Sequence, residues 1–388
     1  MNKVNLADWP YFSEAELMQL TEVLNSGNWW RGNGDKVIEF ENKFANFHKA
    51  TYGLGVTNGT HAILLALKAL GLKPGDEVIV PSFTFISTIL PIMELGGIPI
   101  PVDVEPNTFC ISPSEIKKAI TNKTVGIIPV HMAGNICRMK EICEISKKNN
   151  LFIIEDACHA HGAEYNYKKA GSFGDFGVFS FQALKLMTSG EGGCLITSDK
   201  DLYNKVQVLH NVGRPLGDTN YQHVNMGSNF RMSEFQAAVL IPQLERISSQ
   251  NKIRLENGKS LTKSLSSYSE FIPQTIDPLC NLHSYYMYMF YYNAHKLELS
   301  REELINELNN RGIPAYRAYS QVNETEVFKR YIAGLGKEYS SLLKNNYPNS
   351  QNISNNVVWI HHRILLDKSE DISNVLIELI SQKSVIQK

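Results

Sequence analysis

The first two-thirds of the chain alternates short apolar runs with stretches of helical periodicity. Four apolar runs predict strands, at residues 76–81, 98–103, 125–131 and 151–156. Their nearly continuous apolar character is typical of strands buried on both faces, as in a parallel sheet. Helices are predicted between them, at 139–148 and after the capping sequence Ser112-Pro113-Ser114-Glu115. This alternation predicts an α/β domain with a mainly parallel central sheet.

The pattern changes after about residue 233. Residues 233–263 predict a long helix that is capped by Ser233 and contains Pro242, which should kink it. A run rich in Tyr and Met at 284–293 then predicts a strand, and Ser300 begins another capped helix. We therefore predict a large domain at residues 1–245 and a smaller C-terminal α+β domain at 246–388, joined through the long helix.

Composition narrows the class of protein. The 388 residues are 43% hydrophobic and 20% charged, as in an ordinary globular protein. With 38 basic and 39 acidic residues, charge gives no reason to expect binding to nucleic acid or to an anionic membrane. The N-terminus lacks an apolar signal region, and no apolar run is long enough to span a bilayer. Six scattered cysteines without a C-x-x-C pair predict reduced thiols in the cytoplasm and no metal site.

A glycine-containing turn at residues 56–62 precedes the helical run 63–70. The free N–H groups and the dipole of a helix N-terminus favour an anion such as phosphate, and Thr60 can add a hydroxyl donor. A plain turn that Asn58 or Thr60 caps explains the same residues, and taken alone it is the simpler interpretation.

Asp156 ends the predicted strand 151–156, at the edge where open α/β sheets bind ligands. An ionised aspartate there could hold a proton on a heterocyclic nitrogen, although many strands end in Asp for capping or solubility. His159 follows closely and fits a ligand contact or a core histidine equally well.

Lys185 lies inside the apolar stretch 179–193, which ends in glycines. A lysine withdrawn from water more readily provides the neutral amine that Schiff-base chemistry needs. A lysine that extends to solvent before a glycine turn fits equally well. The polar turn at 227–236 similarly places Asn229 and Arg231 where they could reach an anion, or simply begins the long helix.

Together and in this order, these segments resemble the DegT/StrS group of pyridoxal-phosphate sugar aminotransferases, which have fold type I like aspartate aminotransferase. The likeness covers nearly the whole chain. More closely, the chain is similar to 3-amino-5-hydroxybenzoate (AHBA) synthases at residues 28–32, 56–62, 81–87, 129–134, 181–182, 185–188 and 358–363. The 2-deoxy-scyllo-inosose aminotransferases are similar in several of these segments, notably at Gln182 and in the glycine-rich run 190–193.

The resemblance implies a role for each matching residue. Lys185 would form the Schiff base with pyridoxal 5'-phosphate and later move the proton, while Asp156 would pair with the pyridine nitrogen. His159 would lie beside the cofactor ring and Phe85 would stack on it. The phosphate contacts would be Gly59, Thr60, Ser180 and, from the neighbouring subunit, Asn229. The last role implies a homodimer with active sites at its interface.

The resemblance also implies the reaction, in which glutamate or glutamine gives its amino group to a keto sugar, first of all a nucleotide-linked one, or to a keto-cyclitol. Candidate acceptor contacts are Trp29, Trp30, Arg31, His131 and His361. A packed aromatic pair and a surface arginine explain the first three equally well.

Two departures from the family at large lie where the substrate is expected, so they leave the substrate open. Ala183-Leu184 stands where many members have Pro-Thr, and 315–319 replaces a more usual His-Tyr segment, so the acceptor is not determined. An AHBA-synthase-type reaction, in which loss of water makes an aromatic ring, would use the same residues. A non-catalytic regulator with this fold is the third possibility, and intact Lys185 and Asp156 argue against it.

Overall fold

A seven-stranded sheet forms the centre of the large domain. The computed structural model describes residues 3–6, 8–297, 299–367 and 369–386. The strand order is β1-β9-β8-β5-β4-β2-β3. Their bounds are β1 Tyr52–Val56, β9 Gly193–Thr197, β8 Phe176–Ser180, β5 Phe152–Asp156, β4 Thr124–Ile127, β2 Glu77–Pro81 and β3 Ile98–Val102. Neighbours from β8 to β3 pair in parallel, whereas β9 is antiparallel to both β1 and β8. The predicted mainly parallel sheet is confirmed.

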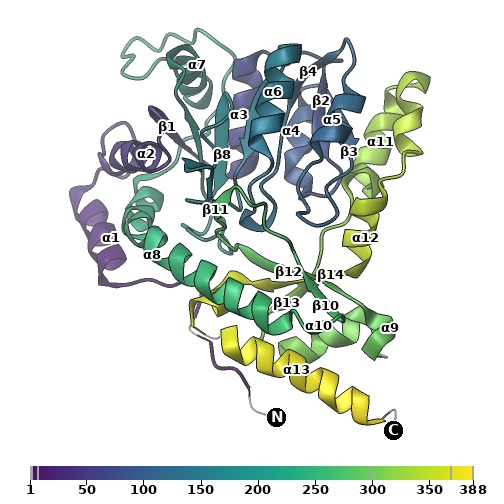
Figure 1. The fold of residues 1–388 in the computed structure, drawn as a ribbon. Helices are drawn as coiled ribbons and strands as arrows, with labels where there is room; N and C mark the ends of the chain where they lie inside the picture. Colours follow the sequence, from purple (N-terminus) through teal and green to yellow (C-terminus); the bar gives the residue numbers. More distant parts are fainter. Residues whose placement is uncertain (1–2, 7, 298, 368, 387–388) are drawn as a thin grey trace.

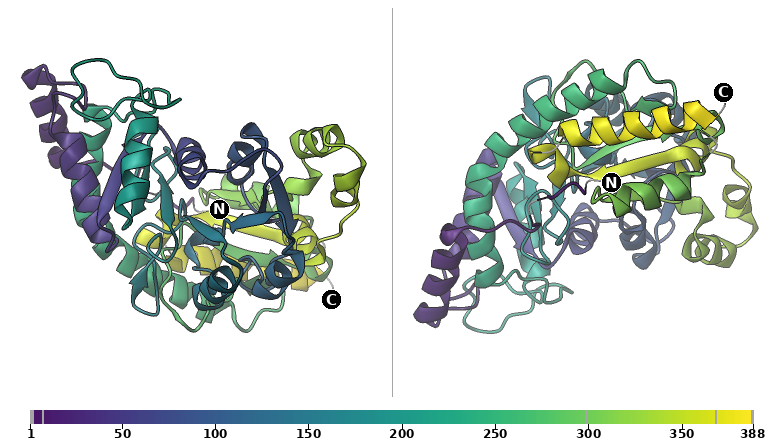
Figure 2. Two further views of the ribbon diagram at one scale, coloured as in Figure 1. Left: turned by 90° about the horizontal axis from the view of Figure 1, so that it is seen from above. Right: turned by 90° about the horizontal axis from the view of Figure 1, so that it is seen from below.

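Helices cover both faces of this sheet because its strands are apolar on both sides. Every residue of β2, β3, β8 and β9 is buried. Figure 1 shows covering helices behind the sheet and in front of it, and Figure 2 shows the same layers from above and below. These helices are α3 Gly59–Leu70 and α4 Leu90–Glu94 behind, and α5 Pro113–Ala119 and α6 Met139–Asn149 in front.

A second, antiparallel sheet builds the smaller C-terminal part. Its order is β10-β12-β14-β13, and its strands are β10 Phe271–Pro273, β12 Met287–Tyr292, β14 Val357–His361 and β13 Ala315–Arg317. Helix α10 Arg301–Asn310 begins with the predicted cap, because Ser300 and Glu303 form a capping box. This sheet has its own apolar core, which includes residues of α13 Ser369–Ile386.

Helix α8 Glu234–Leu265 connects the two sheets and contains Pro242, as predicted. Its capping box at Ser233 fixes where it begins. The predicted domain boundary at 245/246 falls inside this helix, which runs beside α13 below the large sheet (Figures 1 and 2). Both described ends of the chain lie on this lower side (Figure 1).

The remaining elements fill the surface around the two sheets. The remaining α-helices are α1 Glu14–Ser26, α2 Lys36–Phe47, α7 Lys200–His210, α9 Ala294–Leu297, α11 Glu326–Gly334 and α12 Pro348–Asn356. Short strands β6 Glu164–Tyr165, β7 Lys168–Lys169 and β11 Cys280–Leu282 form a third sheet. Short 3₁₀ helices cover Ile86–Thr88, Met132–Gly134, Val322–Glu324, Lys337–Leu343 and His362–Leu366. Within the described ranges, no helix combines the length and apolarity that crossing a membrane requires.

Several buried histidines make the fold sensitive to acid. Burial lowers the pKa of His161, His210 and His283 to about 3, and that of His361 to about 4. Because these values lie below the ordinary value of 6.5, the unfolded chain binds more protons wherever the pH is between the two values. The contribution of these histidines to the free energy of unfolding is therefore fully present above about pH 6.5, and it is lost as the pH decreases from that value toward 4.

We expect each of these histidines to steepen the loss of stability by about 1.4 kcal/mol per pH unit. Denaturant unfolding at several pH values between 7.5 and 4.5 measures the slope. A His283→Gln variant, which removes one such group, should show a slope shallower by about one proton. A free energy of unfolding that stays level down to pH 4.5 would contradict the burial of these rings.

Candidate active site

Asp156 ends β5 at the carboxyl edge of the large sheet, and its carboxylate is held on both sides. Its Oδ2 accepts a hydrogen bond of 2.9 Å from the Thr88 hydroxyl, and its Oδ1 accepts one of 3.2 Å from the Cys158 backbone N–H. The residue is only 7% exposed. A buried acid is thus fixed in orientation, and its oxygens retain further lone pairs for a ligand.

Lys185 lies in the loop between β8 and β9. The loop is closed by hydrogen bonds from the Lys185 N–H to the Gln182 carbonyl (2.8 Å) and from the Thr188 hydroxyl to the Phe181 carbonyl (3.0 Å). Gln243 of α8 holds Thr188 from below, accepting from its N–H and donating to its carbonyl. The Lys185 Nζ lies 4.4 Å from the centre of the Tyr286 ring, so its amine stands over an aromatic face.

The N-terminus of α3 meets the ends of β8 and β9. Asn58 caps the helix, because its side-chain oxygen accepts from the His61 N–H at 2.8 Å. A Cβ on Gly59 would lie 3.0 Å from Ser180 Cβ, and one on Gly193 would lie 2.3 Å from the Asn58 carbonyl carbon. Glycine is needed at position 193 for this close approach, and a side chain at position 59 would be tightly packed. The free N–H groups of the first turn therefore sit at the sheet edge, where they favour an anion.

These three features open into one cavity of about 580 Å³. The predicted residues that line it are Gly59, Thr60, Phe85, Asp156, His159, Ser180 and Lys185. Lining residues to which the sequence assigned no role include Thr88, Cys158, Tyr286, Tyr319 and Trp359. The last three come from the C-terminal part of the chain, where the aromatic run 284–293 and the segments 315–319 and 358–363 were the available signals. The cavity thus lies where the two sheets meet.

His159 is neutral in this cavity. Its ring stacks on Tyr286 with centres 4.3 Å apart, and its Nδ1 lies 3.4 Å from the Ala133 backbone N–H, which donates to it. Burial first, and the nearby Lys185 charge second, hold the pKa of His159 well below its ordinary value. Since Nδ1 accepts a hydrogen bond, the ring proton belongs on Nε2.

Other predicted residues lie outside this cavity. Arg31 and His131 are buried and held by carboxylates, at 2.6 Å from Glu41 and 3.0 Å from Glu155 respectively. Neither lines the cavity. The prediction that they contact the acceptor is therefore not supported by their positions, because each side chain is held by a buried acid instead. His361 is buried and does not line the cavity either. Trp29, Trp30 and Asn229 are exposed on the surface, outside the cavity lining.

Arg31 is expected to act on stability. Replacing it with methionine leaves Glu41 buried without its partner and should lower the free energy of unfolding by about 3–5 kcal/mol. Adding Glu41→Gln to Arg31→Met should recover most of the loss, since glutamine keeps an acceptor for the Gly55 N–H. Denaturant unfolding of the single and double variants measures this. Lost turnover at unchanged stability would instead return Arg31 to the substrate site.

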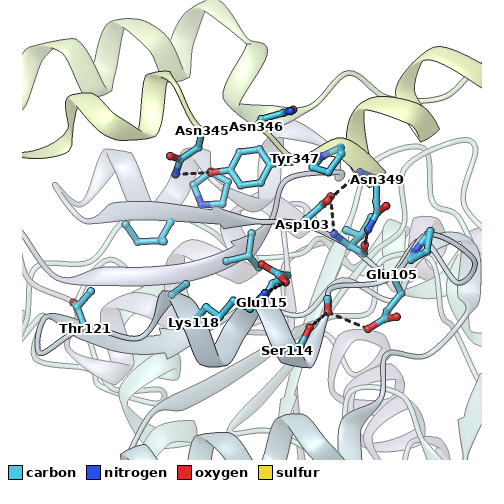
Figure 3. A pocket seen from close by; sticks show the side chains of 18 residues that line it. Asp103, Glu105, Ser114, Glu115, Lys118, Thr121, Asn345, Asn346, Tyr347 and Asn349 are labelled. Atoms are coloured by element: carbon cyan, nitrogen blue, oxygen red, sulfur yellow. Dashed lines mark hydrogen bonds and ion pairs between the residues drawn. The ribbon is translucent and has the colours of Figure 1, made fainter.

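A second cavity, of about 720 Å³, lies beside β3 and α5 (Figure 3). Asp103 in its wall is already satisfied, because its carboxylate accepts from the N–H groups of Asn349 and Ser350. Glu115 is paired with Lys118 on the same helix. This cavity contains none of the residues that the sequence singled out for chemistry, so the candidate active site is the cavity around Lys185.

Comparison with known proteins agrees with this geometry. Residues 10–379 match the DegT/DnrJ/EryC1/StrS aminotransferase family. The 3-amino-5-hydroxybenzoate synthase of Amycolatopsis mediterranei (strain S699) is 39% identical over 360 residues, covering 92% of this chain and 92% of that protein. The L-glutamine:2-deoxy-scyllo-inosose aminotransferase of Micromonospora echinospora is 31% identical over 389 residues, covering 95% and 92%. The crystal structure of an AHBA synthase has a TM-score of 0.92 at 37% identity and covers 99% of this chain and 100% of that one.

Proposed function

Because the chain belongs to the DegT/DnrJ/EryC1/StrS aminotransferase family, we propose that it transfers an amino group from glutamate or glutamine to a keto sugar or a keto-cyclitol. It is a pyridoxal-phosphate enzyme with the fold type I architecture of its structural relatives. The observation that carries the proposal is that Lys185, Asp156 and the N-terminus of α3 open into one cavity.

The cavity fits pyridoxal phosphate group by group. Its aldehyde needs an amine, which Lys185 offers, and its ring nitrogen needs an acid, which Asp156 offers. Its phosphate needs an anion site, for which the first turn of α3 and the Ser180 hydroxyl are placed. Flat partners for the ring are His159 and Phe85, whose side chain is 53% exposed at the cavity although it is large and apolar.

When bound, pyridoxal phosphate supplies an electron sink for negative charge at the substrate carbon that bears nitrogen. Asp156 would hold the proton on the ring nitrogen, with Thr88 and the Cys158 N–H fixing its carboxylate. The Lys185 amine would bond to the cofactor and, once released, would remove and return a proton as general base and acid. The neutral His159, which carries its proton on Nε2, would donate a hydrogen bond from that nitrogen.

The donor and the acceptor follow from relatives. The Micromonospora relative is named for glutamine and a scyllo-inosose, which supports glutamine as donor and a cyclitol as acceptor. The family resemblance supports a keto sugar as acceptor, and a nucleotide-linked keto sugar is the first candidate. The exposed Trp29, Trp30 and Asn229 would reach the cavity of a partner subunit in a homodimer with shared active sites.

Absorbance of the purified enzyme tests the proposal. L-glutamine or L-glutamate should convert the visible band of the bound cofactor to the ultraviolet band of its amine form, and the D-enantiomers should not. Nucleotide-linked keto sugars and keto-cyclitols are then added singly, and the true acceptor should restore the visible band and yield an aminated product by mass spectrometry. No change with either L-amino acid would contradict amino transfer.

One observation favours a second function. The 39% identity to a 3-amino-5-hydroxybenzoate synthase supports a dehydration that yields an aromatic ring. The Lys185 amine would then remove a proton from the substrate, and water would leave. A cofactor band that no amino donor alters, together with an aromatic product from an aminated cyclic substrate, would favour this reaction over amino transfer.

A further inference from the structure

The two peptide carbonyls that immediately precede Lys185 are each held by a side chain from a distant part of the sequence. The indole Nε1 of Trp9 donates to the Ala183 carbonyl at 3.1 Å. The Nε2 of His362 lies 3.2 Å from the Leu184 carbonyl. These contacts join the loop to residues 174 and 178 positions away. Segments near both ends of the chain therefore meet at this loop.

The two donors support each other. The Trp9 and His362 rings meet edge to face, with centres 4.4 Å apart and planes at 88°. The segment around Trp9 is fixed on either side, because the Val4 N–H donates to the Arg311 carbonyl and Arg246 donates to the Tyr11 carbonyl. His362 is fully buried directly after β14. Each ring therefore packs against the other beside the loop.

His362 acts as a neutral donor. A carbonyl oxygen can only accept, so the contact with Leu184 requires hydrogen on Nε2. The Nδ1 of the same ring is buried and has no partner among the described residues, as expected for its unprotonated nitrogen. Burial, with His361 and Arg254 as secondary causes, holds the pKa of His362 well below its ordinary value. The Leu184 contact therefore persists across the neutral pH range.

Without these two donors, the peptide groups before Lys185 would be restrained from one side only, by Gln182 within the loop. Gln182 bonds to the N–H groups of Leu184 and Lys185, but it leaves the carbonyls of 183 and 184 to other partners. The loop contacts of Gln243 lie beyond the lysine, at Thr188. Trp9 and His362 thus supply the restraint on the side that precedes the lysine.

We propose that Trp9 and His362 are positioning residues, which fix the 183–184 peptide groups and thereby hold the Lys185 amine over Tyr286 and toward Asp156. This inference rests on the proposed function of Lys185. Displacement of a catalytic group by about an ångström can cost an enzyme up to roughly 100-fold in rate. Trp9 and His362 would therefore affect catalysis through the position of Lys185, without touching cofactor or substrate.

Two variants remove one hydrogen bond each. Trp9→Phe keeps a ring against His362 and deletes the N–H donor, and His362→Leu deletes the other donor. We expect either to lower kcat of the holoenzyme's half-reaction with L-glutamine by roughly 10-fold or more, with a donor KM that changes much less. The pH midpoint of the visible cofactor band should shift too. His362→Gln, whose amide can still donate to Leu184, should recover most of kcat.

His283→Gln is the matched control, because it changes another buried histidine that does not line the cavity. A Trp9→Phe variant with wild-type kcat and a wild-type pH midpoint of the cofactor band would overturn the positioning role. A variant that loses stability but keeps both values would overturn it too. If His362→Leu does not fold, Trp9→Phe and His362→Gln still decide the matter. A wild-type protein without a cofactor band would instead overturn the proposed function itself.

Discussion

Replacing Lys185 with alanine is expected to lower the rate of amino transfer by roughly 10³-fold or more, because the chain loses both the amine that bonds to the cofactor and its general base. The visible absorbance that comes from lysine-bound pyridoxal phosphate should disappear as well. Stopped-flow absorbance of the half-reaction with L-glutamine measures the rate, and a spectrum of the purified variant shows the loss of the band.

Lys117→Ala is the matched control, because this lysine is exposed on α5 and distant from the cavity lining. It should retain wild-type turnover and spectrum. Full turnover by a folded Lys185→Ala variant would mean that another group does the chemistry, and the assignment of the site would fall.

Replacing Asp156 with asparagine should have the second largest effect. The amide has the shape of the carboxylate but no charge with which to hold a proton on the ring nitrogen, so kcat should fall by roughly 10²-fold or more. The cofactor should still bind, since Lys185 and the N-terminus of α3 are unchanged. Measuring kcat beside the cofactor content of the variant separates the two effects.

A graded comparison comes from Thr88→Val, which removes one of the two hydrogen bonds to Asp156 and leaves its charge. Its loss of kcat should be clearly smaller than that of Asp156→Asn. Equal losses would indicate that orientation of the carboxylate, not its charge, is what matters. Wild-type kcat in Asp156→Asn would remove the acid from the mechanism.

Much of the fold could be predicted from the pattern of apolar residues. The runs 76–81, 98–103 and 151–156 correspond to β2, β3 and β5, while 125–131 overshoots β4, which ends at Ile127 because Pro129 follows. Strands β1, β8 and β9 of the seven-stranded sheet were not predicted. Glycines interrupt or border each of them, and these glycines are there for close approach, which a single sequence does not reveal.

The candidate site was predictable only in its local parts. Gly59, Asp156 and Lys185 follow motifs of their own, and the structure brings them to one cavity. Thr88 and Trp9 act through tertiary contacts, with Asp156 and with the Ala183 carbonyl, that no local pattern indicates. Tyr286 and His362 lie in the segments 284–293 and 358–363, which were noted, but the sequence does not show what they contact. The partners of Arg31 and His131 were not predictable for a related reason. Glu41 lies 10 positions away on α2 and Glu155 lies 24 positions away on β5, and only the fold brings each pair together.

The central claim is that the Lys185 amine bonds to pyridoxal phosphate, and reduction of the holoenzyme with borohydride tests it most directly. Borohydride makes the bond between lysine and cofactor permanent, and peptide mass mapping after proteolysis then locates it. The account predicts the cofactor's mass on the peptide that contains Lys185 and on no other. Attachment at a different lysine, or at none in a protein that carries the cofactor band, would contradict it.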